Sequence, residues 1–291
     1  MKSLHGAAPR MELTRRMVFR GNAAAFGGRI VRPSDVVLEM PGASSLPVTG
    51  GRSIARIPRT QFKNFVSFES ASTLAEGLFD DLKGAIALSN HGVREDTLTS
   101  STRAQAEIRK LVVGSKQRLT VKRLSAELLA KSPTGSGEPP ISLGDASVDG
   151  LQIDGFKVKV EIEKDVFQRC DTYSKLLAAA DKADFARKYR NQFFMATDFP
   201  GRPAPPFGRP LRGRETIYAT IVKKIDWDGQ PNPRARIDNH TIIVEDFGTI
   251  FFGELFISST SRRLTMMRLE LGSDEGGQAS GPEVDINGGW S

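Results

Sequence analysis

The fold is decided by residues 247–271, which read FGTIFFGELFISSTSRRLTMMRLEL. Two runs rich in Ile, Leu, Phe and Met flank the polar stretch SSTS. Short apolar runs joined by turn-forming residues are typical of paired β-strands, because alternate side chains of a strand face one core. The stretch therefore predicts an antiparallel hairpin that turns at 258–261.

Glu254 stands between two phenylalanines in the most apolar part of this hairpin. A turn at 258–261 places Glu254 opposite Thr265, with Arg263 as a diagonal neighbour. A lone buried carboxylate is costly, and a guanidinium within reach removes most of that cost. We therefore expect Glu254 and Arg263 to form a buried structural pair. The alternative is that Glu254 is a functional carboxylate.

The antiparallel pattern extends beyond the hairpin. Apolar and polar residues alternate over 215–271, which predicts a contiguous antiparallel meander. Residues 151–162 predict a second hairpin, because Asp154-Gly155 forms a tight turn between two alternating runs.

Helical signals occupy two other regions. In 73–90, Leu74 and Leu78 begin a series of apolar residues spaced by four, behind a pair with capping-box spacing, Thr73 and Glu76. This spacing predicts a helix. The remaining helical predictions are a helix at 102–113, either a strand and a short helix or one helix at 118–132, and one long helix at 172–195 with Asp171 as its cap.

Together these elements predict an α+β fold dominated by antiparallel β-sheet, with a helical insertion and one long helix. Proline- and glycine-rich stretches divide the chain between them. The expected parts are a β-rich N-terminal part at 1–131 with the helical insertion at about 73–131, a linker at 132–148, a hairpin plus helix at 149–198, a Pro/Arg-rich linker at 199–214, the meander at 215–272, and an acidic, glycine-rich tail at 273–291.

The charge of the chain favours an anionic partner. The net charge is +7, and residues 273–291 contain four acidic residues and no lysine or arginine, so the body before them is more basic still. A basic surplus attracts polyanions such as nucleic acid, although it also serves solubility. The arginines expected to contact a polyanion lie in flexible segments: Arg15, Arg16, Arg202, Arg209, Arg212 and Arg214.

The sequence contains no complete catalytic motif. Its three histidines are widely separated and it has a single cysteine, so we expect no metal site, and no glycine pattern indicates a nucleotide cofactor. The weak catalytic candidates are the carboxylates Glu254, Glu245 and Asp246, which would have to assemble in the fold.

We therefore expect a non-enzymatic binding or assembly protein that contacts a protein partner, a second copy of itself or a polyanion. The alternative is a carboxylate-dependent hydrolase or nuclease, and a peripheral protein at an anionic membrane is a third hypothesis. No stretch approaches the roughly 18 apolar residues of a membrane-spanning helix, and no secretory signal is recognisable at the N-terminus. The expected location is the cytoplasm.

Overall fold

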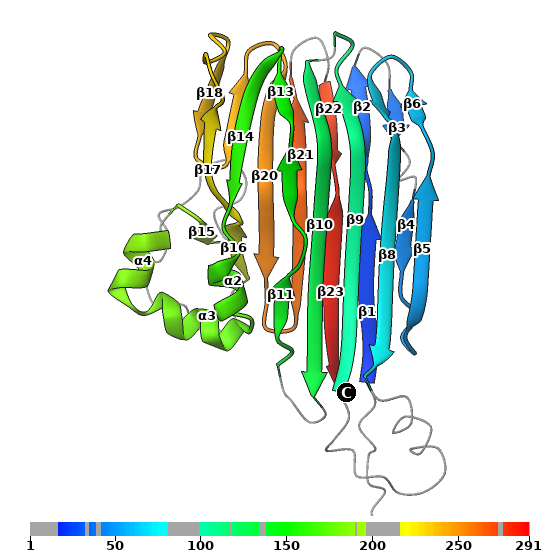
Figure 1. Ribbon diagram of the computed structural model, residues 1–291, viewed down its shortest axis with the longest axis vertical. Helices are drawn as coiled ribbons and strands as arrows, with labels where there is room; N and C mark the ends of the chain where they lie inside the picture. The colour runs from blue at the N-terminus through cyan, green and yellow to red at the C-terminus, as the bar shows by residue number, and fades with distance from the viewer. Residues whose placement is uncertain are drawn as a thin grey trace, which may run out of the picture.

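The computed structural model describes residues 17–32, 35–38, 42–80, 99–116, 118–133, 138–189, 191–195, 216–272 and 276–290. Within these ranges the chain is mainly antiparallel β-structure and forms two sheets, which we call sheet A and sheet B. The sheets stack face to face, and three short helices lie beside them near one end (Figure 1).

Sheet A contains twelve strands. The two strands of the opening hairpin, β20 (Gly248–Ile257) and β21 (Ser261–Leu271), lie at its centre. The other strands are β1 (Met17–Ala24), β2 (Gly27–Arg32), β3 (Val36–Leu38), β4 (Ala43–Ser45), β15 (Phe193–Met195), β16 (Ile217–Thr220), β18 (Ala235–Asp238), β19 (Thr241–Val244), β22 (Gly276–Ser280) and β23 (Glu283–Trp290).

Sheet B contains eleven strands. Its two longest strands, β9 (Thr99–Val113) and β10 (Leu119–Pro133), pair along almost their whole length. The other strands are β5 (Gly51–Ile57), β6 (Thr60–Phe62), β7 (Val66–Phe68), β8 (Ser70–Phe79), β11 (Ile141–Leu143), β12 (Ser147–Asp149), β13 (Leu151–Ile153), β14 (Phe156–Ile162) and β17 (Val222–Trp227).

The hydrophobic core lies between the two sheets. Strands β9 and β10 of sheet B pack across β23 of sheet A, with β1 and β21 on either side. Alternation buries every second side chain of β9 from Ser100 to Ile108, and many of these side chains are small, such as Ala104 and Ala106. Because each sheet has one face in this core, its other face is the one available to a partner.

The helices predicted at 73–90 and 102–113 are wrong in the described residues. Ser70–Phe79 and Thr99–Val113 are the strands β8 and β9, whereas 81–98 lie outside the described residues. A spacing of four residues is an even number, so it also keeps side chains on one face of a strand. Leu74 and Leu78 accordingly share the outer face of β8. Residues 118–132 likewise contain one strand and no helix.

The long helix predicted at 172–195 is also wrong. The segment contains α3 (Tyr173–Ala180), α4 (Ala183–Tyr189) and strand β15, and α2 (Asp165–Arg169) precedes them. The cap of α3 is Thr172, not Asp171, because the Thr172 hydroxyl accepts a hydrogen bond from the backbone N–H of Lys175. Among the described helices none is long and apolar enough to cross a membrane.

The β-strand predictions agree better with the structure. The hairpin at 151–162 is confirmed, with its turn at Asp154-Gly155. The meander is confirmed for β18 to β21, which pair in sequence order, but β17 leaves it to pair with β14 in sheet B, and β16 pairs with β20 instead of with β17. The C-terminal segment is not a tail in its described part, because β22 and β23 pair with β21 on one side and with β2 and β1 on the other. The predicted linker at 132–148 contains β11 and β12.

Candidate anion-binding groove

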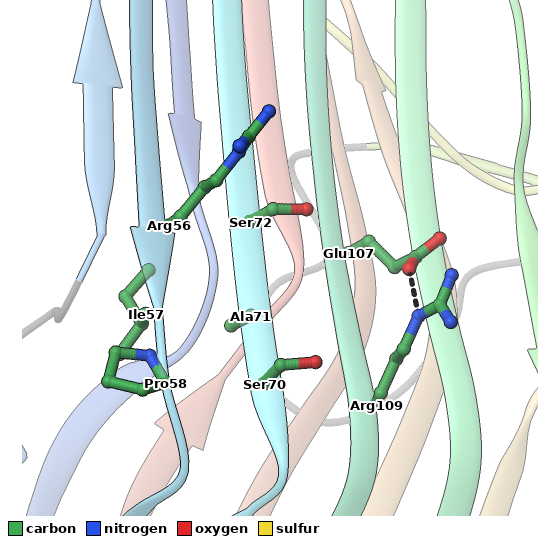
Figure 2. Close-up of a pocket in the computed structure, with 8 residues that line it drawn as sticks. All are labelled: Arg56, Ile57, Pro58, Ser70, Ala71, Ser72, Glu107 and Arg109. Carbon is green, nitrogen blue, oxygen red and sulfur yellow. Dashed lines mark hydrogen bonds and ion pairs between the residues drawn. The ribbon is translucent and has the colours of Figure 1, made fainter.

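A polar groove crosses the outer face of sheet B between β5 and β9, above β8 (Figure 2). Its larger hollow has a volume of about 530 Å³ and is lined by Arg56, Ile57, Pro58, Ser70, Ala71, Ser72, Glu107 and Arg109. A smaller hollow of about 160 Å³ continues along β5 and β8 and shares Arg56 and Ser72 with the first. We call the two hollows together the arginine groove.

Strand alternation brings the polar side chains of the arginine groove together. In the pairing of β5, β8 and β9, Arg56 lies opposite Ser72, and Ser72 lies opposite Glu107. One pleat further along, Ser70 lies opposite Arg109. Residues in direct register on one face of a sheet lie about 5 Å apart, so the polar side chains of these three strands lie close together.

Glu107 is the only carboxylate among the lining residues, and two arginines form hydrogen bonds to it. Arg109 Nε donates to Glu107 Oε1 at 2.6 Å, and Arg123 Nε from β10 donates to Glu107 Oε2 at 2.8 Å. Partial burial alone would raise the pKa of Glu107, but these two hydrogen bonds outweigh it and hold the pKa below its ordinary value. Glu107 is therefore an ionised, occupied acceptor rather than a proton-accepting base.

The arginine groove keeps several hydrogen-bond donors free. Within the described part of the chain, Arg56 and the hydroxyls of Ser70 and Ser72 make no side-chain hydrogen bond or ion pair. Figure 2 shows the Arg56 side chain reaching over Ser72, with both hydroxyls directed toward β9. An arginine presents five N–H donors and no acceptor. The groove thus offers donors and positive charge to a ligand, which is the chemistry that binds an anion.

The register predicted for Glu254 is correct, but its predicted partner is wrong. Glu254 lies opposite Thr265, and its side chain is 2% exposed. The cation that binds it is Arg268, whose Nε and Nη2 donate to the two carboxylate oxygens at 2.6 and 2.7 Å. Arg263 instead lies over the ring of Phe256, 4.7 Å from its centroid.

Gly253 explains this exchange of arginines. Its φ of 63° lies in the left-handed region, and the buried side of β20 switches there, from Phe252 before it to Leu255 after it. Glu254 consequently lies on the outer face of sheet A, together with Phe251 and its cross-strand partner Arg268.

Tyr218 and His240 complete the cluster around Glu254. The Tyr218 hydroxyl donates to Glu254 Oε1 and lies 3.2 Å from His240 Nε2. Burial lowers the pKa of His240 to about 4, so its imidazole is neutral at physiological pH. Burial, together with the neighbouring Glu254, raises the pKa of Tyr218. Both oxygens of the Glu254 carboxylate are partnered, as a structural pair requires.

The structure does not bring the three candidate carboxylates together. Glu245 and Asp246 lie at the tight turn between β19 and β20, where both are exposed and form ion pairs with Arg234. Six residues of extended strand separate Gly248 from Glu254, which at 3.3 Å per residue is roughly 20 Å. The arginines predicted to contact a polyanion, Arg15, Arg16, Arg202, Arg209, Arg212 and Arg214, all lie outside the described residues.

Sequence reasoning missed Arg56, Arg109 and the two serines of the groove. Alternation of polar and apolar residues in RAQAEIR (103–109) is a signal that could have found Arg109, because these polar residues fall on one face of a strand. RSIAR (52–56) carries no such signal, since Ser53 and Ile54 interrupt the alternation. The helix predicted at 102–113 places Arg109 on a helix surface, whereas Arg56, Ser70 and Ser72 lie outside both predicted helices.

Comparison with known proteins places the chain in a family without assigning it a role. Residues 17–258 match the family described as "Domain of unknown function (DUF8256)", and the chain belongs to that family. No curated protein and no solved structure matches the chain. Among the described residues, no group of three or more His, Cys, Asp or Glu side chains is arranged to hold a metal ion.

Proposed function

We propose that this protein is a non-enzymatic binding protein that recognises an anionic group in the arginine groove. The observation that supports this proposal is the set of free donors around Arg56. Its guanidinium and the hydroxyls of Ser70 and Ser72 have no partner among the described residues, while the adjacent carboxylate, Glu107, is already occupied by two arginines.

An incoming anion gains from this arrangement because it breaks no existing contact. Arg109 uses only its Nε toward Glu107, so its Nη groups remain able to donate to an anion. A guanidinium that donates to an oxyanion forms charge-assisted hydrogen bonds, which are roughly twice as strong as neutral ones. The backbone below the groove is paired in a sheet, so binding has to order side chains and no backbone segment.

The alternative, a carboxylate-dependent hydrolase or nuclease, has less support. Such an enzyme needs carboxylates close together with at least one free to take a proton or a metal. Glu254 is held on both oxygens by Arg268, and it lies far along β20 from Glu245 and Asp246. We therefore keep binding as the proposed function.

The test is thermal unfolding in the presence of sulfate, diphosphate or citrate, with sodium chloride at matched ionic strength as the reference. A bound anion at about ten times its Kd adds about 1.4 kcal/mol to the free energy of unfolding. We expect this stabilisation in the wild type, and we expect Arg56→Gln or Arg109→Gln to remove most of it.

The matched control is Arg236→Gln. Arg236 is also an exposed arginine, in β18 of the other sheet, and within the described part of the chain its only ion pair is a long one of 3.9 Å to Asp238. Its replacement lowers the net charge by the same amount without touching the groove. Equal loss of stabilisation in Arg56→Gln and Arg236→Gln would show that the anions act through overall charge, and the proposal would fail.

A further inference from the structure

Strand β5 forms an edge of sheet B. Within the described residues it pairs with β8 and with no other strand, so the backbone groups on its other side are not used by the sheet (Figure 1). Its seven residues include Ile54, an aliphatic side chain that is 47% exposed. A long edge strand with an exposed apolar residue is a template for an added strand.

Charges alternate across sheet B and end with arginine on β5. Glu127 of β10 binds Arg103 of β9 at 2.5 Å, Arg103 lies opposite Glu76 of β8, and Glu76 lies 3.3 Å from Arg52 of β5. Opposite charges on adjacent strands stabilise a sheet. The next strand beyond β5 would continue this order with an acidic side chain.

The other outward residues of β5 define the rest of the pattern. Arg56 repeats the positive charge four residues after Arg52, and Ile54 lies between them on the same face. An antiparallel partner would therefore match β5 best with the order acid, apolar, acid at alternate positions.

A second copy of β5 does not meet this requirement. The antiparallel register that pairs all seven residues of two β5 strands places Arg52 opposite Arg56 at both ends. Like charges directly opposite one another destabilise a sheet. The same edge that attracts an acidic strand thus disfavours pairing with itself, which is how edge strands avoid aggregation.

We propose that β5 binds an extended acidic segment of another protein as an additional antiparallel strand of sheet B. The backbone of that segment pairs with β5, its two acidic side chains lie opposite Arg52 and Arg56, and an apolar side chain covers Ile54. The inference rests on the proposed function to the extent that Arg56 belongs to both sites. Arg109 does not, because it lies two strands away from the edge.

The experiment measures binding of a fluorescent heptapeptide, Thr-Glu-Thr-Val-Thr-Glu-Thr, to the whole protein by anisotropy. Two further peptides have the same sequence with N-methyl groups on the odd-numbered or on the even-numbered residues. In an antiparallel pair only alternate N–H groups point to the neighbouring strand. We therefore expect one N-methylated peptide to lose binding and the other to keep it.

The side-chain part of the inference is tested on the same peptide. Each exposed ion pair is worth about 0.2–1 kcal/mol, so Arg52→Gln and Arg56→Gln should each raise Kd by up to about 5-fold. Arg109→Gln should leave it unchanged. Arg56→Glu should bind a peptide with one glutamate replaced by lysine better than it binds the parent peptide.

The outcomes separate this inference from the proposed function. Equal binding of both N-methylated peptides, or no binding of the parent peptide, overturns strand addition. If Arg56→Gln and Arg109→Gln still abolish stabilisation by small anions, the arginine groove stands without it. If the small anions have no effect but one N-methylated peptide alone fails to bind, the edge is the site and the groove is not.

Discussion

The outer faces of the two sheets use the same pair of charged groups in opposite ways. On sheet A, Arg268 closes on Glu254 with two hydrogen bonds and lies 3.7 Å from the centre of the Phe251 ring. On sheet B, Arg56 lines the same hollow as Glu107, a carboxylate that Arg109 and Arg123 already bind. A carboxylate close to a guanidinium therefore does not by itself indicate a binding site. Hydrogen-bond donors that have no partner among the described residues do indicate one.

The largest expected effect on stability comes from breaking the pair of Arg268 and Glu254. Arg268→Met should cost about 3–5 kcal/mol of unfolding free energy, because it leaves Glu254 buried and uncompensated, and Glu254→Leu with Arg268→Met should recover much of that loss. The measurement is urea unfolding of the single and double variants. The control is Arg263→Met, which loses a contact with the Phe256 ring, worth about 0.5–1 kcal/mol, and an attraction to Asp285 opposite it, but leaves Glu254 paired. Equal losses for Arg263→Met and Arg268→Met would contradict the pairing seen here.

The next effect is the pH dependence of the same cluster. The pKa of His240 is about 4 in the folded protein and 6.5 as a free side chain, so the unfolded chain binds the proton more readily. Stability is therefore full above pH 6.5 and falls as the pH drops toward 4, by about 3 kcal/mol for this one group. Unfolding free energies at several pH values in this window measure the slope. His240→Gln should flatten it, and an unchanged slope would show that His240 is not its source.

A smaller effect on stability is expected for Gly253, where the buried side of β20 switches. In Gly253→Ala the new Cβ would lie 2.7 Å from Ile221 Cγ1, in a backbone conformation that costs a non-glycine residue about 1–3 kcal/mol. We expect a loss in that range by thermal unfolding. Gly272→Ala is the matched control, since nothing lies within 4 Å of its Cβ position. If the two variants unfold alike, Gly253 does not set the direction of Glu254.

The smallest effect on stability is expected on the outer face of sheet B. Arg56→Gln should change the unfolding free energy by less than about 0.5 kcal/mol, because it removes no contact within the described residues. Arg123→Gln, on the same face, should cost about 1 kcal/mol, since it removes hydrogen bonds to Glu107, Ser147 and Asp145. Chemical denaturation compares them, and a larger loss for Arg56→Gln would mean that Arg56 has a structural role.

Sequence alone predicted the strands whose apolar residues are large and whose turns are specific, as in β13, β14, β20 and β21. It failed for β8 and β9, where the buried residues are mostly serine, threonine and alanine. Alanine, glutamate, glutamine and arginine are all good helix formers. The alternation of polar and apolar residues predicts a strand, but the high helix propensity of these residues predicts a helix. Pairing with strands distant in the sequence makes both segments β-strands.

The candidate site was out of reach for a related reason. The register of Glu254 follows from the position of one turn, so sequence could supply it. The choice of Arg268 over Arg263 depends on a backbone φ at Gly253, and a glycine within a strand was the only sign of it. The arginine groove depends on three strands lying side by side, and the residue spacing in two of them predicts helices.

The position of β23 has a consequence for how the molecule is made. This strand lies between β1 and β21, so the first described strand of the chain pairs with the last. During synthesis β1 leaves the ribosome more than 250 residues before its partner and must wait, with one edge unpaired, until 283–290 emerge. The joint that β23 makes between β1 and Ser261–Thr265 of β21 therefore forms only after translation has passed this point, and a nascent chain that stalls earlier leaves both of those edges without this partner.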